Sequence, residues 1–206
     1  MIAIIDYGVG NLFSLKSSLD MIGIESIVTG DKEEIKKCDK ILLPGVGAFQ
    51  DAANKLRQSG LDKVIIEEAE NKKPILGICL GMQLLFEKSF EYGEHIGLGL
   101  IKGEIRPIKE VIPEGLKIPH IGWNKLDFTS KKSKLFKYIK DKDFVYFVHS
   151  YYGAKCNDDT IATSDYGYPL TAAVEKDNVF GCQFHPEKSG NVGLNILKAF
   201  ADMEVE

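Results

Sequence analysis

The apolar positions in the first half of the chain follow two patterns that alternate. Short continuous runs, MIAIID at 1–6 and KILL at 40–43, are strand-like, and each is followed by a turn that contains glycine. Helical spacing then follows, first at four residues placed three and four positions apart: Leu12, Leu15, Leu19 and Ile22. Similar stretches are predicted up to Leu56 and beyond Gly60, before the run PILGI at 74–78. This alternation is typical of βα units that form a parallel sheet.

From about residue 100 the pattern becomes richer in β segments. The clearest are FVYFVHSYY at 144–152, TAAVEK at 171–176 and VFGCQFH at 179–185, and a closing helix is predicted over 192–203. The connection at 129–143 is rich in Lys, Ser and Asp, and predicts a solvated loop around one short helix. No break in composition marks a domain boundary. We therefore expect a single domain over residues 1–206, an α/β fold with a doubly wound, mostly parallel or mixed central sheet and flanking helices.

The composition narrows the kinds of partner. With 44% hydrophobic and 27% charged residues and a formal net charge of -4, the 206-residue chain has no basic excess that would indicate a nucleic acid or an anionic membrane surface. The expected partner is a small molecule or another protein. Asp6 interrupts the first apolar run, no basic segment precedes it, and no later run approaches the roughly 18 residues of a membrane span. We therefore expect a cytoplasmic protein without a membrane segment.

The four cysteines are expected to be reduced thiols. They stand at positions 38, 79, 156 and 182, without the C-x-x-C spacing that would indicate a zinc site or a disulfide framework. His120 and His149 also lack a second ligand at a suitable spacing, so neither a metal nor a cofactor is expected. Cys182 lies inside a predicted strand, away from any helix N-terminus, and is not predicted to be reactive.

Cys79 stands where a strand-like run changes into a helix-like one, in GICLG at 77–81. A sharp strand-to-helix turn projects a nucleophile from the edge of a sheet and leaves no room for side chains two residues away, which explains the G-x-S-x-G elbow of α/β hydrolases. The helix N-terminus favours a thiolate, and its N–H groups, beginning with that of Leu80, can receive an oxyanion. Taken alone, the pattern also fits a buried structural cysteine.

His185 and Glu187, in QFHPEKSG at 183–190, are spaced so that extended backbone directs both side chains to one face. Pro186 fixes its own φ and biases His185 towards an extended conformation. A carboxylate beside an imidazole sets its tautomer and stabilises its charged form, as the base of a cysteine nucleophile requires. An isolated H-P-E could also be a surface histidine beside a solvated acid. Together with the elbow, it indicates a Cys-His-Glu triad.

The segment LLPGVGAF at 42–49 places two glycines after a strand. They free the backbone for unusual dihedral angles and for close approach to a ligand, so a second oxyanion donor could come from Val46 or Gly47. An ordinary βα turn is the alternative. The segment lacks the G-x-x-x-x-G-K-[ST] pattern of a phosphate-binding loop.

With these motifs the chain resembles the class I, triad-type glutamine amidotransferases and, within that family, the glutaminase subunits of imidazole glycerol phosphate synthases. The resemblance spans nearly the whole chain and implies a flavodoxin-like fold. It rests on DYGVGNL at 6–12, LPGVGAF at 43–49, GICLGMQLLFE at 77–87, GLGLI at 97–101, PHIGWN at 119–124, FVHSYY at 147–152 and FHPEKSG at 184–190.

The resemblance implies a role for each site residue. Cys79 would attack the amide carbon of L-glutamine and form a thioester, His185 would act as base and then as acid, and Glu187 would orient the imidazole. The oxyanion hole would be formed by N–H groups of Val46, Gly47 and Leu80. Glutamine would be bound by Gln83, Ser150 and Tyr151.

The resemblance also implies a partner, a (β/α)₈-barrel synthase subunit that receives the ammonia. There ammonia would react with a phosphoribulosyl formimino carboxamide nucleotide to give imidazole glycerol phosphate and an aminoimidazole carboxamide ribotide. The implied docking residues are Asn11, His120, Trp123, Asn124 and Lys188. Without the resemblance, the single tryptophan would be assigned to the core.

Three other functions remain open. The chain could donate ammonia to a different acceptor, such as an amidino-sugar synthase, with the same catalytic residues. It could be a thiol peptidase or amidase, which would have a peptide-sized cleft and no docking surface. A binding module without catalysis is disfavoured because all three triad residue types are present.

Overall fold

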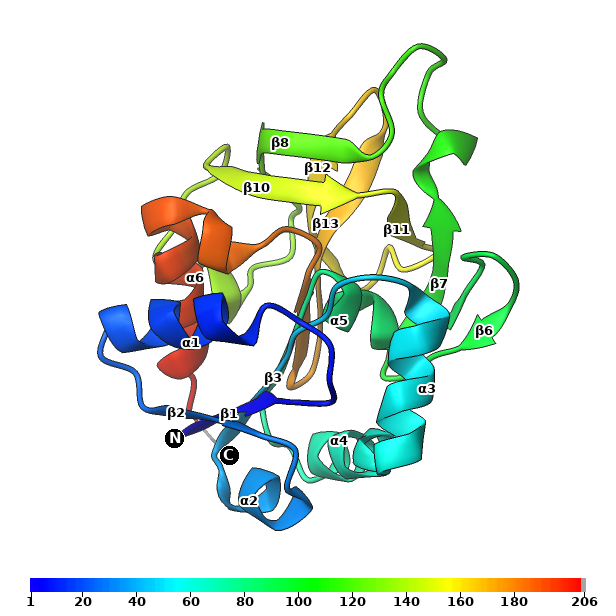
Figure 1. Cartoon of the computed structure of the whole chain (residues 1–206). Helices are drawn as coiled ribbons and strands as arrows, with labels where there is room; N and C mark the ends of the chain where they lie inside the picture. The colour runs from blue at the N-terminus through cyan, green and yellow to red at the C-terminus, as the bar shows by residue number, and fades with distance from the viewer. Residues whose placement is uncertain (205–206) are drawn as a thin grey trace.

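The computed structural model describes residues 1–204 and is built around an eight-stranded sheet (Figure 1). The parallel part contains, in spatial order, β2 (Ser26–Thr29), β1 (Ile2–Ile5), β3 (Lys40–Leu43), β4 (Ile75–Ile78) and β14 (Val179–Cys182). Antiparallel strands extend it beyond β14: β13 (Pro169–Lys176), β12 (Thr160–Asp165) and β9 (Asp127–Phe128). The predicted fold class, a mostly parallel sheet of mixed type, is confirmed.

Helices cover both faces of this sheet (Figure 1). On one face lie α1 (Leu12–Met21) and α6 (Gly190–Ala201). On the other lie α2 (Lys32–Lys37), α3 (Phe49–Ser59), α4 (Leu61–Glu70) and the short α5 (Leu80–Leu84). The helix predicted from the spacing after residue 12 is confirmed. The predicted closing helix begins at Gly190 and ends at Ala201, so it lies two residues earlier than expected.

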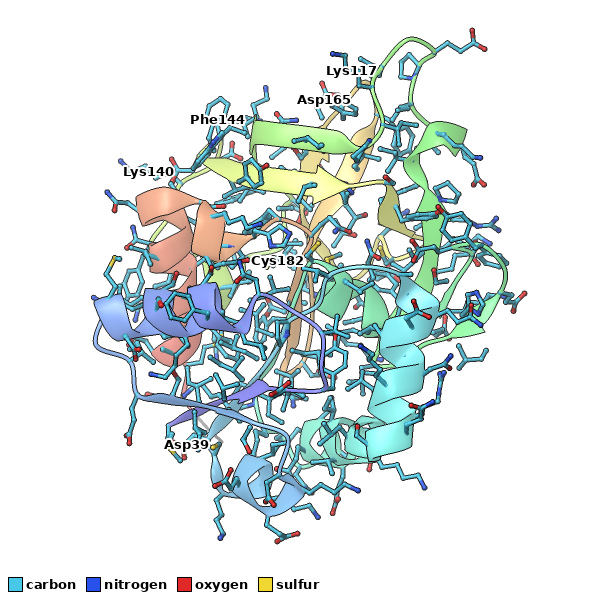
Figure 2. The ribbon with its side chains drawn as sticks, viewed as in Figure 1. Asp39, Lys117, Lys140, Phe144, Asp165 and Cys182 are labelled. Atoms are coloured by element: carbon cyan, nitrogen blue, oxygen red, sulfur yellow. The ribbon has the colours of Figure 1, made fainter. Side chains whose placement is uncertain are left out.

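Three of the parallel strands, β1, β4 and β14, lack polar side chains along their whole length because both of their faces are buried. In β1, Ala3 and Ile5 pack into the core that includes α3 and α4, whereas Ile2 and Ile4 pack into the core that includes α1 and α6. Successive side chains of a strand point to opposite faces, so a sheet between two helical layers requires apolar residues at every position. Cys182, at the end of β14, lies in this interior (Figure 2).

The second half of the chain also forms two small sheets. β10 (Phe144–His149) pairs with β8 (His120–Lys125). A second sheet contains β11 (Tyr151–Ala154), β7 (Ile101–Pro107), β5 (Phe86–Ser89) and β6 (His95–Ile96). The segment 144–152, predicted as one β segment, is thus divided at Ser150 between two sheets. The resulting corner lines a cavity at the end of β4.

Short 3-10 turns occur in the connections: η1 (Ile108–Glu110), η2 (Lys134–Phe136) and η3 (Pro186–Lys188). The connection 129–143 contains η2, as its composition predicted. Within residues 1–204, none of the helices has the length and apolar character needed to cross a bilayer.

Candidate active site

Cys79 occupies the sharp turn between β4 and α5. Its φ of 55° and ψ of −111° lie in a region that non-glycine residues adopt only under strain. A Cβ atom on Gly77 would lie 2.7 Å from the Gly81 carbonyl oxygen, and one on Gly81 would lie 1.8 Å from the Leu43 carbonyl oxygen. Both flanking positions therefore require glycine, for the reason proposed from the sequence. The elbow places Cys79 at a cavity beyond the end of the parallel strands.

His185 lies beside the Cys79 sulfur and is held by Glu187. Nδ1 of His185 is 2.8 Å from Oε1 of Glu187, and the Cys79 side chain lies close enough to the imidazole to raise its pKa. Since Nδ1 faces the carboxylate, Nε2 is the ring nitrogen that faces sulfur. The two side chains meet because β4 and β14 are adjacent parallel strands, with Cys182 opposite Ile78 immediately before the two catalytic turns.

The His185 imidazole is stabilised in its protonated form. Burial alone would lower the pKa, because a charged ring loses hydration. Hydrogen bonds and charges of Cys79 and Glu187 outweigh this effect and raise the pKa of His185 from 6.5 to about 9. The side chains of His185 and Glu187 are each 3% exposed, so solvent screens the pair little. A protonated imidazole at neutral pH is the partner that a thiolate nucleophile requires.

Two glutamines extend the polar contacts of the sulfur. Nε2 of Gln183 donates to Sγ of Cys79 at 3.7 Å, and Nε2 of Gln83 donates to Oε1 of Gln183 at 3.0 Å. Gln83 was predicted from the sequence, but Gln183, which is completely buried, was not. The available signal was a polar residue inside the apolar run VFGCQF, because such a residue needs a buried hydrogen-bond partner.

The turn after β3 lies against the elbow. A Cβ atom on Gly45 would lie 2.9 Å from the backbone nitrogen of Gly81, so this close approach requires glycine. The Tyr7 hydroxyl donates to the Pro44 carbonyl at 2.8 Å and ties the turn to the segment after β1. The residues predicted to form the oxyanion hole all line the cavity that contains Cys79: Val46, Gly47 and Leu80.

The cavity above Cys79 has a volume of about 560 Å³, within the usual range for small-molecule sites. Its lining includes every residue predicted to bind glutamine: Gln83, Ser150 and Tyr151. Charged side chains of both signs also line it: Glu91, Lys109 and Lys188. An anionic and a cationic group together suit the ammonium and carboxylate groups of a free amino acid.

Glu91 is a second residue of the site that was not predicted from the sequence. Its Oε2 accepts a hydrogen bond from the Phe49 backbone nitrogen at 2.6 Å, at the start of α3, where Ala48 provides no side-chain cap. Burial raises the pKa of Glu91, although the bond from Phe49 opposes this effect. A glutamate in a loop such as FEYGEHIG is usually solvated, and no local pattern indicated that this loop reaches the cavity.

Most of the predicted docking residues lie at the surface near the cavity. Trp123 on β8 is 56% exposed, so this tryptophan does not belong to the core. Lys188 is exposed, and Asn11 and Asn124 are half-buried. The assignment of His120 to this surface is wrong, because its side chain is 3% exposed and its ring is covered on both faces by aromatic rings.

Residues 1–204 contain no cluster of three or more His, Cys, Asp or Glu side chains that could hold a metal ion. His120 and His149 contact each other instead. All four cysteines are free thiols.

Comparison with known proteins places the chain in a class. Residues 3–203 match the family described as glutamine amidotransferase class-I. The chain therefore belongs to the class I glutamine amidotransferase family. Among solved structures it resembles PurLQS from Thermotoga maritima, with a TM-score of 0.76 at 22% identity over 97% of this chain and 96% of that one. It also resembles the glutaminase domain of Trypanosoma brucei CTPS with bound acivicin, with a TM-score of 0.67 at 18% identity over 100% and 96% of the two chains. At these identities the likeness concerns the fold.

Two curated relatives are similar over their full length. The chain is 48% identical to a protein of Wolinella succinogenes over 98% of this chain and 100% of the relative. It is 52% identical to a protein of Oceanobacillus iheyensis over 98% of this chain and 99% of the relative. Both relatives are named imidazole glycerol phosphate synthase subunit HisH.

Proposed function

We propose that the chain is the glutaminase subunit of an imidazole glycerol phosphate synthase in histidine biosynthesis, and that it hydrolyses L-glutamine to glutamate and ammonia. Full-length relatives at 48% and 52% identity carry the name of that subunit. The observation that carries the proposal is the contact of His185 with both Cys79 and Glu187 beside a cavity suited to one amino acid. The predicted single domain over 1–206 and the cytoplasmic location belong to this proposal, and four free thiols support the location.

Acylation begins with the Cys79 thiolate paired to the protonated His185. The sulfur attacks the side-chain amide carbon of glutamine, and the carbonyl oxygen becomes an oxyanion. Backbone N–H groups at Leu80 and at Val46 and Gly47 receive that charge. The proton on Nε2 of His185 then passes to the departing nitrogen, ammonia leaves, and a thioester remains on Cys79.

Deacylation reverses these roles. Neutral His185 takes a proton from a water molecule, which attacks the thioester carbon. The second tetrahedral intermediate expels the Cys79 thiolate and releases glutamate, so the thiolate and the protonated imidazole are restored. Glu187 holds Nδ1 of His185 throughout, which keeps Nε2 towards the reacting atoms and stabilises the charged ring.

Glutamine is oriented by the groups along the cavity. The Glu91 carboxylate faces the substrate ammonium, and the cavity-lining lysines supply cations for the α-carboxylate. Ser150 and Tyr151, at the corner where β10 ends and β11 begins, line the wall of the cavity beside Gln83. This arrangement selects a free amino acid, because each end of the zwitterion has a charge partner.

The proposed partner is a (β/α)₈-barrel synthase subunit in a heterodimer. Ammonia released into neutral water becomes protonated and ceases to be a nucleophile, so its use requires a closed path to the acceptor. Three large apolar side chains on β8 and β10 support docking beside the cavity, because each is more than half exposed: Ile121, Trp123 and Phe144. Figure 2 shows Phe144 at the start of β10, and the cavity-lining His149 ends the same strand.

The test is glutamine hydrolysis and synthase product formation by the chain mixed with its barrel subunit. With glutamine as the nitrogen source, Cys79→Ala should lose at least about a thousandfold in both activities. With ammonium salt as the source, the same complex should still form product, which shows that docking is intact. Cys38→Ala removes a buried thiol remote from the cavity and is the matched control. Glutamine-dependent activity in Cys79→Ala would rule out the nucleophile, and stimulation by a different acceptor enzyme alone would rule out the histidine pathway.

A further inference from the structure

Two histidines that the proposed chemistry does not use lie between the β8–β10 pair and the glutamine cavity. His120 and His149 are 3% and 5% exposed, and Nδ1 of His120 lies 3.0 Å from Nε2 of His149. The His120 ring is stacked on Phe147 and Tyr166, with ring centroids 4.9 Å and 4.2 Å away. These contacts hold both rings in place, and His149 reaches the cavity wall.

The backbone carbonyl of Tyr151 determines which ring nitrogens carry hydrogen. Nδ1 of His149 lies 2.8 Å from this oxygen and must donate to it, because a carbonyl only accepts. Nε2 of neutral His149 is then an acceptor, so His120 must donate from its own Nδ1. Nε2 of His120 accepts in turn from the Asn124 amide at 3.4 Å. Asn124 also donates to the Asp165 carbonyl at 2.8 Å, at the outer side of β8 (Figure 2).

The same carbonyl connects the histidines to the substrate side. Nε2 of Gln83 donates to the Tyr151 oxygen at 3.4 Å and to Gln183, which in turn donates to the Cys79 sulfur. In this chain of hydrogen bonds, which runs from Asn124 through both histidines and the Tyr151 carbonyl to Gln83, every donor faces an acceptor. Because both hydrogens on Gln83 Nε2 are directed at protein acceptors, its Oε1 is left to accept from the ammonium of glutamine.

Both rings are neutral near pH 7, as the direction of the hydrogen bonds requires. Burial lowers the pKa of His120 from 6.5 to about 4. Burial also lowers the pKa of His149 to about 3; the hydrogen bond to the Tyr151 carbonyl opposes this effect, and His120 and His185 each add a smaller lowering. A cationic His149 would lie close to the protonated His185, so neutrality also protects the charge of the catalytic base.

We propose that His149, kept as the Nδ1–H tautomer by His120 and Asn124, is a positioning residue that fixes the Tyr151 carbonyl and thereby the Gln83 amide that meets glutamine. This inference rests on the proposed glutaminase function. In the opposite tautomer, the lone pair on Nδ1 of His149 would face the Tyr151 carbonyl oxygen and repel it. The backbone at 150–151 would then lose the hydrogen bond that holds it in place. Asn124 therefore influences glutamine binding without contact with the substrate.

The tautomers can be measured directly on the full-length chain by ¹⁵N NMR of the imidazole rings near neutral pH. The chain has four histidines, so comparison of the parent spectrum with those of His95→Gln, His185→Asn and His149→Asn assigns each signal to one ring. We expect both His120 and His149 to carry hydrogen on Nδ1, whereas free imidazole side chains favour Nε2. Hydrogen on Nε2 of His149 would overturn the proposal, and this outcome does not depend on any enzymatic activity.

Two substitutions of His149 separate positioning from packing. In His149→Asn the amide nitrogen takes the place of Nδ1 and can still donate to Tyr151, whereas in His149→Gln it takes the place of Nε2. Calorimetry with L-glutamine in the Cys79→Ala background should show dissociation constants weakened roughly tenfold by His149→Gln and recovered to within about threefold by His149→Asn. Equal weakening by both would indicate packing alone and contradict the proposal.

Asn124→Asp tests the end of this chain of hydrogen bonds that lies farthest from the glutamine cavity. An aspartate cannot donate, so His120 must donate from Nε2 and both tautomers reverse. We expect the NMR signature to switch to Nε2–H at His149 and glutamine binding to weaken roughly tenfold, as in His149→Gln. An unchanged tautomer together with unchanged glutamine binding would refute the coupling. Absence of glutamine binding in the parent chain would instead contradict the proposed function and leave the tautomer result standing.

Discussion

His185 and the pair formed by His120 and His149 are buried to nearly the same extent but differ in charge. Their exposed fractions are 3%, 3% and 5%. The pKa of His185 is raised to about 9, whereas the pKa of His120 is lowered to about 4 and that of His149 to about 3. Burial acts in the same direction on all three, so the neighbours decide the outcome.

The neighbours differ in whether they carry negative charge. His185 contacts a carboxylate and a thiol that can ionise, and both favour the imidazolium. His149 meets a carbonyl, and His120 meets an amide nitrogen and aromatic faces. None of these can compensate a buried positive charge fully. The surroundings of His185 therefore hold a proton for transfer, whereas those of His120 and His149 keep the directions of their hydrogen bonds fixed.

The largest expected effect is on the charged region. His185→Asn should reduce glutamine hydrolysis by at least about a thousandfold, because proton transfer is lost in both halves of the reaction. Glu187→Gln should cost roughly tenfold less, because it removes the group that orients the ring but leaves the ring itself. Turnover is measured in the complex at saturating glutamine. Equal losses in the two variants would contradict the division of roles.

The second prediction concerns alkaline pH. Because the folded pKa of His185 is about 9 and the ordinary value is 6.5, the native state binds this proton more tightly. The contribution of this proton to the free energy of unfolding is fully present below pH 6.5 and is lost as the pH rises through about 9. Denaturant titrations should show this decline. In Cys79→Ala the pKa of His185 should fall because one stabilising partner is absent, and an unchanged NMR titration would argue against the contact.

The third prediction concerns acid pH and the neutral pair. The unfolded chain protonates these rings near 6.5, but the native state resists until about 4 for His120 and about 3 for His149. The free energy of unfolding should therefore fall as the pH drops below 6.5 towards these values. His149→Asn cannot be protonated, so its slope should be smaller by at most about 1.4 kcal/mol per pH unit. Identical slopes would mean that His149 is already charged in the native state.

The sequence could predict the parts of the molecule that depend on neighbouring residues. The βα units follow from apolar runs that are buried on both faces, and the elbow at Cys79 follows from two glycines whose Cβ atoms would collide with backbone. His185 and Glu187 are two positions apart, so local backbone geometry is enough to bring them together.

Other parts depend on pairings between distant strands. His120 and His149 meet because they lie opposite each other in the β8–β10 register, which no local pattern specifies. It was the resemblance that placed His120 at the docking surface, and no local pattern indicated the division of 144–152 at Ser150. Gln183 and Glu91 contribute to the site through contacts 100 and 42 residues away along the chain.

The most direct test of the central claim is to find which cysteine reacts with an electrophilic glutamine analogue. Cys182 ends β14 and Cys79 directly follows the adjacent strand β4, but of the two only Cys79 lines the cavity, and burial raises the pKa of Cys182 well above its usual value. Peptide mapping by mass spectrometry should find one adduct per chain, on Cys79, formed at an unchanged rate in Cys182→Ser and much more slowly in His185→Asn. An adduct on another cysteine, or the same rate on Cys79 without His185, would contradict the account.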